Sequence, residues 1–525
     1  MNLRAVANTV SFLLLLLSLG MFLSAGFGFI YDYPETGGLL ACRPALHLIA
    51  CGLATALPAL AVFLVTRRRR GEPELQVGIR EGFASVAFGW AVASCFCGLP
   101  FILSAHFRIA DAIFETAAGL TTTGASIISD QLVLNDGSLL DGGLESLSHA
   151  LLFWRCLLNW FGGVGIVFFA LLVQPFLSMN RGAMLYNAEV PGLKTDNSQL
   201  APRVRNSVLM LTVVYLTLTA LAALVYSLCG MSFFDAICHA FSSVSTGGFS
   251  TRADSIGAFE SPALHWAAIF MMFVSACNFT LILKLLTEGK FIFWQDEEFR
   301  FFLKMVLGAI LITTLLIWFN CPDGLPLMGA SSAHPRTLEY YLRLAAFHVI
   351  SLASTTGYAI SDYEAWRVPP ILILFFLIMF PAGCGGSTAG GMKCSRIIVV
   401  AKHALYEIRH CLSPRTVCDI RLSGERIPSS MISKTTAFIG IYVAVVFAVA
   451  SIILFSCCNT SIPTAFGAAL TCISNVGPGF GQVGPALSFG WMSVPIKLLL
   501  SLTMIAGRLE LYTICVLFLP SFWKR

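Results

Sequence analysis

The chain is predicted to be an all-α integral membrane protein in which four pseudo-repeats of helix, re-entrant helix with loop, and helix surround one pore. Hydrophobic residues make up 57% of its 525 residues and charged residues only 12%, whereas soluble domains carry about 25% charged residues. Four short loops of small polar residues also recur, and their central glycines are spaced by 123, 110 and 120 residues (Gly124, Gly247, Gly357 and Gly477). Such regular spacing indicates a repeated structural unit.

Apolar stretches of about 20 residues can cross a bilayer as helices. The first stretch follows Arg4, but it is longer than a signal peptide needs, so we expect it to remain in the protein. We expect an N-terminal helix pair at 1–70, then pore repeats at 71–180, 181–290, 291–405 and 406–525. The ten candidate spans are 9–30, 44–66, 78–104, 148–174, 206–229, 263–287, 302–319, 367–400, 433–457 and 490–519.

Basic residues predict the orientation, because they are enriched in cytoplasmic loops. Arginines 67–70 follow the second span, and the segment 393–434 after the eighth span is the richest in lysine and arginine. These segments fall on the same side as both ends of the chain. The sequence therefore predicts cytoplasmic termini and four loops that face outward.

Each glycine loop follows a segment of about 13 residues, which is too short to span a membrane but long enough for a re-entrant helix. These segments are 109–121, 232–244, 341–354 and 462–474. The C-terminal end of a helix carries partial negative charge, and loop carbonyls can replace the water around a cation. Small residues can also serve only close helix packing. Four equivalent loops favour an ion filter over that alternative.

The candidate ligands of the transported cation are therefore loop residues, since glycine lets the backbone turn its carbonyls inward. They are Thr122, Thr123, Gly124, Ser245, Thr246, Gly247, Thr355, Thr356, Gly357, Asn475, Val476 and Gly477.

The eighth span contains glycines that each cost a helix interior about 1 kcal/mol, so we expect it to unwind in mid-membrane and act as a gate. A static kink is the alternative. Arg508 in the tenth span is a second gating candidate, because a charge in the membrane is expensive and usually functional. The candidate gate residues are Gly383, Gly385, Gly386, Ser387, Thr388, Gly390, Gly391, Lys393 and Arg508.

The ordered set of motifs resembles the TrkH/KtrB/HKT superfamily of potassium transporters, and most closely its TrkH type, which also has two leading helices. Thr122–Gly124 and Ser245–Ser250 are similar to the first two filter loops of that family. Further similar segments are Trp154–Gly165, Gly383–Lys393 and Ala506–Glu510. They correspond to the helix after the first loop, the intramembrane gate loop and the last helix with its pore-facing arginine.

The resemblance implies potassium as the transported ion, because a glycine in all four loops accompanies potassium preference in this family. The fourth loop departs from the others, with Asn475 and Val476 in place of Ser and Thr. The resemblance further implies a homodimer in the membrane lipid of the bacterial inner membrane. It also implies a cytosolic nucleotide-binding regulatory subunit, which we expect to contact the basic segments 181–205 and 401–434.

Two other functions were weighed. A sodium or unselective monovalent cation channel or symporter of the same superfamily would use the same architecture. A polytopic membrane enzyme would need converging acidic or histidine side chains, yet Glu115, His239 and His348 are isolated in the sequence. We therefore expect no enzyme activity and no organic cofactor. We expect no nucleic-acid binding either, because the basic residues lie at helix ends, and we read the 17 cysteines as packing residues.

Overall fold

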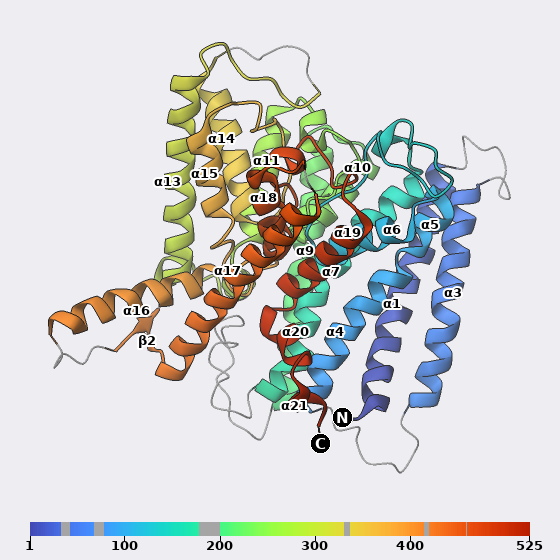
Figure 1. Cartoon of the computed structure of the whole chain (residues 1–525), viewed down its shortest axis with the longest axis horizontal. Helices are drawn as coiled ribbons and strands as arrows, with labels where there is room; N and C mark the ends of the chain where they lie inside the picture. Colours follow the sequence, from blue (N-terminus) through green and yellow to red (C-terminus); the bar gives the residue numbers. More distant parts are fainter. Residues whose placement is uncertain are drawn as a thin grey trace.

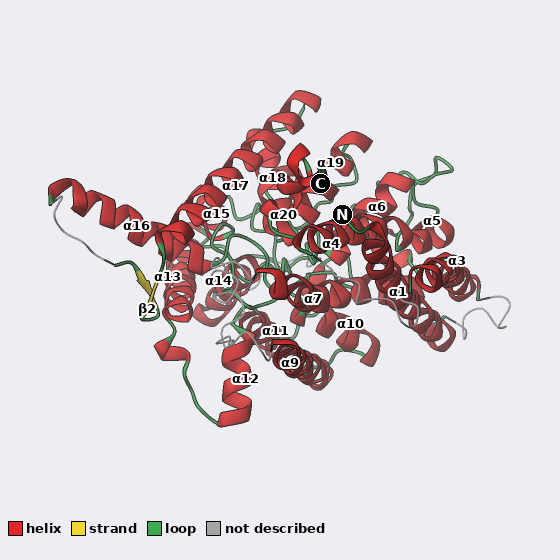
Figure 2. Cartoon of the chain, turned by 90° about the horizontal axis from the view of Figure 1, so that it is seen from below, coloured by secondary structure: helices red, strands yellow, loops and turns green. Residues whose placement is uncertain are grey.

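The computed structural model describes residues 1–32, 42–67, 78–177, 200–329, 336–413, 419–457 and 459–524, with the backbone alone for 166–177 and 200–208. These residues form a helical bundle with one two-stranded hairpin (Figures 1 and 2). The α-helices are α1 (Leu3–Tyr31), α3 (Arg43–Thr66), α4 (Ile79–Phe96), α5 (Leu99–Ala105), α6 (Ile109–Leu120), α7 (His149–Leu177), α9 (Leu200–Leu228), α10 (Phe233–Val244), α11 (Pro262–Ser275), α12 (Phe279–Glu288), α13 (Glu297–Asn320), α14 (Leu338–Ala353), α15 (Pro369–Ile378), α16 (Cys394–Leu412), α17 (Ser429–Ser456), α18 (Ile462–Ser474), α19 (Val494–Arg508), α20 (Leu511–Leu517) and α21 (Pro520–Trp523). The strands are β1 (Arg421–Leu422) and β2 (Glu425–Arg426), and short 3₁₀ turns occupy Gly143–Ser146, Ser255–Ala258, Phe293–Gln295 and Gly481–Val483.

Six stretches of helix in the described part of the chain are long and apolar enough to cross a membrane. They belong to α1, α3, α4 with α5, α9, α13 and α17. Large apolar side chains are exposed on several of them, such as Leu57 on α3 and Leu315 on α13. A bilayer accepts such surfaces, because lipid tails are as apolar as leucine. These helices match predicted spans, and the two chain ends lie at the same end of the molecule (Figure 1).

Four short helices, α6, α10, α14 and α18, lie among the longer helices, and most of their residues are buried. They coincide with the four predicted short segments. Hydroxyl side chains cap three of their N-termini: Ser232 for α10, Thr337 for α14 and Ser461 for α18. Such caps satisfy backbone N–H groups that have no partner within the helix. The first residue of each helix is exposed and the last is buried, so each helix runs from the surface into the protein.

Two predicted spans are not single straight helices. The span 263–287 breaks between α11 and α12 with a bend of 97°, and the span 490–519 breaks between α19 and α20 with a bend of 116°. The first break begins at Ala276 and is closed by Asn278, whose side chain accepts the N–H of Thr280. At the second break Glu510 has a positive φ of 60°, a conformation that a helix does not contain.

The predicted eighth span, 367–400, is also not one helix. It consists of the ten-residue α15, a loop at 379–393 without helical hydrogen-bonding, and the start of α16. α16 then runs away from the bundle together with the β1–β2 hairpin (Figures 1 and 2). The break itself was predicted from the glycines. The change of direction after the break was not predicted. Because of this change, α16 is not part of the spanning segment.

Candidate functional site

The C-terminal ends of the four short helices share one backbone conformation. α6, α10 and α14 end one residue before a Thr or Ser (Thr121, Ser245 and Ser354), and α18 ends on Ser474. The next residue is left-handed, with φ of 50° at Thr122, 55° at Thr246, 58° at Thr355 and 55° at Asn475. Left-handed conformations in β-branched residues are rare and cluster at functional sites. We name the segments that follow loop 1 (121–126), loop 2 (245–250), loop 3 (354–358) and loop 4 (474–479).

A glycine of positive φ follows two residues after each left-handed residue. These glycines are Gly124 (73°), Gly248 (74°), Gly357 (80°) and Gly477 (104°). In loop 2 the structural equivalent is therefore Gly248, one residue after the Gly247 that the sequence pattern selected. Gly247 instead occupies the position of Thr123, Thr356 and Val476. Because loop 2 contains two adjacent glycines, the sequence alone does not show which of them aligns with the glycines of the other loops. The φ angles show that it is Gly248.

The four loops meet one another in a closed ring. A Cβ built on each glycine would come within 3.0 Å of a carbonyl oxygen of the next loop. Gly124 faces the carbonyl of Gly247, Gly248 that of Thr356, and Gly357 that of Val476. Gly477 faces the carbonyl of Thr123, which closes the ring from loop 4 back to loop 1. Backbone packed this closely excludes any side chain at the four positions.

Side-chain hydrogen bonds hold the loops of this ring in place. Asn475 donates to the hydroxyl of Thr123 at 2.9 Å and to the carbonyl of Met504 at 2.9 Å, so its amide joins loop 4 to loop 1 and to α19. Within loops 1 and 3 the hydroxyl pairs Thr121–Thr123 and Ser354–Thr356 lie 2.7 and 2.8 Å apart. Asn475 also suits its left-handed backbone, which asparagine tolerates better than threonine.

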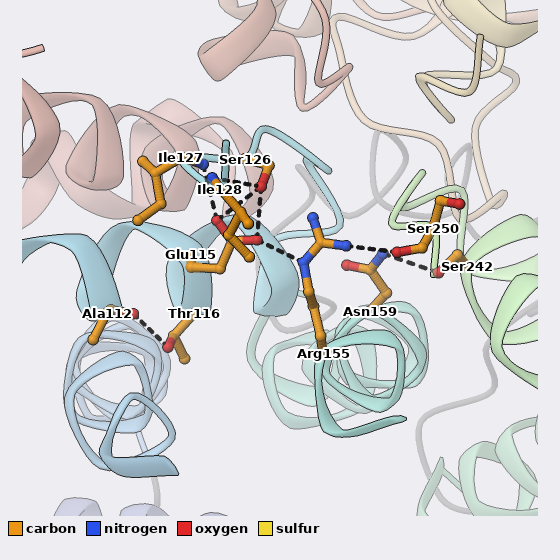
Figure 3. Close-up of polar contacts among 10 residues, drawn as sticks. All are labelled: Ala112, Glu115, Thr116, Ser126, Ile127, Ile128, Arg155, Asn159, Ser242 and Ser250. Carbon is orange, nitrogen blue, oxygen red and sulfur yellow. Dashed lines mark hydrogen bonds and ion pairs between the residues drawn. The ribbon is translucent and has the colours of Figure 1, made fainter. Parts of the chain in front are cut away.

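A buried ion pair connects loop 1 to loop 2 (Figure 3). Arg155 of α7 donates through Nε to Glu115 of α6 at 2.6 Å and through a terminal nitrogen to the carbonyl of Ser250 at 2.9 Å. The same carboxylate accepts the hydroxyl of Ser126 and the N–H of Ile127 at 3.0 Å each. Arg155 also lies over the ring of Phe249, 3.6 Å from its centroid. Glu115 is thus not isolated, contrary to the expectation from the sequence.

Acidic residues in the first turns of α6 and α10 have partners. Lys497 of α19 reaches Asp111 at 2.5 Å, and both side chains are buried. Asp235 accepts the hydroxyls of Ser232 and Thr251 at 2.8 and 2.6 Å. Negative charge at a helix N-terminus stabilises the helix. The Asp111–Lys497 pair was not predicted from the sequence, because the two residues are 386 positions apart.

A cavity of about 440 Å³ lies over the ring. All four positive-φ glycines, Gly124, Gly248, Gly357 and Gly477, contribute to its wall, and Gly247 does not. Backbone of all four loops therefore faces one shared space, as a pathway for an ion requires.

The 379–393 loop lies against loops 3 and 4. The N–H of Gly390 donates to the hydroxyl of Thr355 at 2.7 Å, and a Cβ on Gly390 would collide with the carbonyl of Ser474. Thr388 donates through its hydroxyl to the carbonyls of Val244 and Ser275 at 3.0 and 3.2 Å. Ser387 accepts the N–H of Ala389. These hydroxyls therefore satisfy backbone groups of α10, α11 and the loop itself.

Arg508 is buried, with 3% exposure, and contacts this loop. It donates to the carbonyl of Thr388 at 2.7 Å and to that of Gly162 on α7 at 3.2 Å. Its near neighbour Glu510 pairs with Arg396 at 2.6 Å. Arg508 therefore joins the 379–393 loop to α7.

The 379–393 loop also forms backbone hydrogen bonds with residues at the break between α11 and α12. Cys384 donates to the carbonyl of Ala276, and Phe279 donates to that of Gly386, each at 3.0 Å. Lys393 donates to the carbonyl of Ala389. The loop is thus held on several sides by the helices that carry loops 2, 3 and 4.

Other candidates have structural surroundings. His239 lies 2.7 Å from the carbonyl of Asp235 and 3.0 Å from the hydroxyl of Ser250, and His348 is buried among aromatic rings. Within the described ranges, no group of three His, Cys, Asp or Glu side chains could hold a metal ion. Residues 181–199 of the predicted partner-binding segment lie outside the described residues.

Comparisons with known proteins agree with this architecture. Residues 54–525 match the family model TrkH, described as a cation transport protein. The chain is 34% identical to the Trk system potassium uptake protein TrkH of Salmonella typhimurium and 33% identical to that of Escherichia coli K12, over the full length of each. Its structure matches the crystal structure of the potassium transporter TrkH from Vibrio parahaemolyticus with a TM-score of 0.82 and 28% identity, covering both chains completely. The chain belongs to the TrkH family of cation transport proteins.

Proposed function

We propose that this protein takes up potassium across the bacterial cytoplasmic membrane as the pore-forming subunit of a Trk-type system. The observation that carries the proposal is the closed ring of loops 1 to 4 at the ends of four buried helices. Relatives that match the whole chain are named as potassium uptake proteins. In this proposal the chain consists of an N-terminal helix pair and four pore repeats.

The ring acts as the filter. Carbonyls of loops 1 to 4 replace the water around the entering ion, and the C-terminal ends of α6, α10, α14 and α18 add partial negative charge. The proposed ligands are the loop residues named from the sequence together with Gly248, which is the glycine of loop 2 that has a positive φ. The cavity of about 440 Å³ serves as the outer entrance.

The 379–393 loop acts as the gate. It reaches loops 3 and 4 through Gly390 and is tied to α7 by Arg508. Glycine-rich backbone inside a membrane is tolerated where it borders a cavity or is buried in protein. In the closed state the loop blocks the passage below the ring, and the guanidinium of Arg508 repels the cation.

The assembly is a homodimer in lipid, with both termini cytoplasmic. A cytosolic nucleotide-binding subunit contacts the inner face at the basic segments, of which α16 and the β1–β2 hairpin are described. These elements carry exposed arginine side chains, such as Arg409 on α16 and Arg426 on β2, which suits a cytoplasmic surface.

The experiment that tests the proposal is potassium flux into proteoliposomes that contain this chain, with and without an imposed pH gradient. Flux that follows the potassium gradient and excludes sodium supports a selective gated channel. Flux that needs the pH gradient identifies a symporter. Equal sodium and potassium flux supports the alternative, an unselective monovalent cation channel of the same family.

We predict that Arg508→Ala raises potassium flux, because it removes both the bonds to the gate loop and the positive charge that repels the ion. Arg421→Ala is the matched control, since it removes one arginine from an exposed strand. The measurement is the initial rate of potassium influx in proteoliposomes. Equal rates for the Arg508 variant and the wild type would contradict this role.

A further inference from the structure

The first turn of α13 contacts both the gate loop and the start of α16. Glu298 is buried, with 5% exposure. One oxygen of its carboxylate, Oε1, accepts the N–H of Gly385 at 2.9 Å and the N–H of Ser395 at 2.8 Å. Gly385 lies near the middle of the 379–393 loop, and Ser395 lies in the first turn of α16 directly after it. A single atom thus joins the middle of the loop to the helix that follows the loop.

The position of Glu298 is itself fixed. Asp296 caps α13 by accepting the N–H groups of Glu298 and Phe299 at 2.7 and 3.2 Å. Both hydrogen bonds end on the same buried oxygen atom, so the loop backbone and the start of α16 are held at one point on α13.

The neighbouring residue Glu297 has different partners. Its carboxylate pairs with Lys402 of α16 at 2.5 Å and accepts the N–H of Ser423 at 3.2 Å. Its side chain is 28% exposed. Two adjacent glutamates therefore serve two separate sets of contacts, one at the gate loop and one at the surface.

We propose that Glu298 is a latch that keeps the gate loop in its closed position. Glu298 is a positioning residue, because it acts through the loop and not on the ion. The proposal rests on the proposed function, in which the loop blocks the pore. Opening requires the N–H groups of Gly385 and Ser395 to leave Oε1, so the middle of the loop separates from the start of α16 and the Gly390 contact with Thr355 is lost.

Three variants separate the roles of the carboxylate. Glu298→Ala removes the acceptor, and we expect potassium influx to rise at least about tenfold. Glu298→Gln keeps one carbonyl oxygen that accepts both N–H groups, so its influx stays close to that of the wild type. Glu298→Asp keeps the charge but is too short to reach both groups, and its influx lies in between. Glu297→Ala is the matched control and leaves influx unchanged.

A second readout does not depend on transport. Cys384 lies within the loop and Cys394 directly follows it, and both are buried, with 1% and 0% exposure. Release of the latch exposes them, so alkylation followed by peptide mass analysis should label both faster in Glu298→Ala than in Glu298→Gln. Cys472, buried beneath loop 4, is the internal reference and stays protected if the variant is folded.

Replacement of Gly385–Gly391 by a shorter segment serves as the positive control for gating. If this variant conducts potassium strongly while Glu298→Ala conducts and labels like the wild type, the latch is rejected and the proposed function stands. If no variant conducts potassium, the proposed function fails, and the labelling of Cys384 and Cys394 still decides whether Glu298 holds the loop. Equal opening by Glu298→Gln and Glu298→Ala would also overturn the proposal.

Discussion

Gly248→Ala is expected to abolish selective potassium flux, whereas Gly247→Ala is expected to leave most of it. Gly248 has a φ of 74°, and a Cβ there would meet the carbonyl of Thr356. The left-handed conformation costs an alanine roughly 1–2 kcal/mol. Relief of the collision requires the Thr356 carbonyl to move, so the ring loses a ligand. We expect the preference for potassium over sodium to fall at least about tenfold.

Gly247 provides the matched comparison. A Cβ on Gly247 would meet the side chain of Asn159, not backbone. Its amide can shift, and Asn159→Ala combined with Gly247→Ala removes the two contacts at 2.5 Å and leaves only the Cβ of residue 159, at 2.9 Å. Gly440→Ala controls for expression, because a Cβ there meets nothing within 4 Å. The measurement is sodium and potassium competition in proteoliposomes. Equal losses in the Gly247 and Gly248 variants would show that the register of loop 2 is wrong.

Arg155→Ala is expected to produce the largest loss of stability. It leaves the buried carboxylate of Glu115 without its partner, and breaking a buried ion pair from one side costs about 3–5 kcal/mol. The carbonyl of Ser250 also loses its donor. Loops 1 and 2 then lose the side chain that holds them together (Figure 3). The thermal unfolding midpoint in detergent measures the stability, and ion competition measures the filter.

The double variant Glu115→Leu with Arg155→Met separates stability from positioning. Replacing both charges with apolar groups of similar volume is often neutral for stability, so the unfolding midpoint should return toward the wild-type value. Selectivity should not return, because no side chain then connects Ser126 and Ile127 to Ser250. Recovery of both properties would mean that the pair has no positioning role. Arg252→Ala, which removes a half-exposed arginine, is the control for charge.

Local sequence patterns predicted the four short helices and the break in the eighth span. Glycine and threonine carry that information themselves, because glycine destabilises a helix wherever it lies. The bends after Ala276 and Leu509 were missed because their causes are distant. At the first, backbone of the 379–393 loop takes the place of helical hydrogen bonds through Cys384 and Gly386. At the second, Glu510 meets Arg396, which lies 114 residues earlier.

The loop residues of the site could be predicted from the sequence, but the contacts that hold these loops in place could not. The loop residues were found because their pattern repeats, whereas the supporting contacts do not repeat. Glu115 with Arg155, Asp111 with Lys497 and Glu298 with the gate loop each occur once. A single sequence gives no signal that pairs such residues across 40 to 386 positions. The register of loop 2 was missed for a different reason, because two neighbouring glycines fit the pattern equally well.

The pair Asp111–Lys497 has a consequence for biosynthesis. The two residues are 386 positions apart, and a ribosome adds about 5–20 residues per second. Asp111 therefore enters the membrane roughly 20–80 seconds before Lys497 exists. During this interval the nascent first repeat carries an acidic side chain with no lysine to neutralise it, so it must stay hydrated, bind a proton or be shielded by the insertion machinery. Assembly of the ring is thus completed only after the last repeat leaves the ribosome.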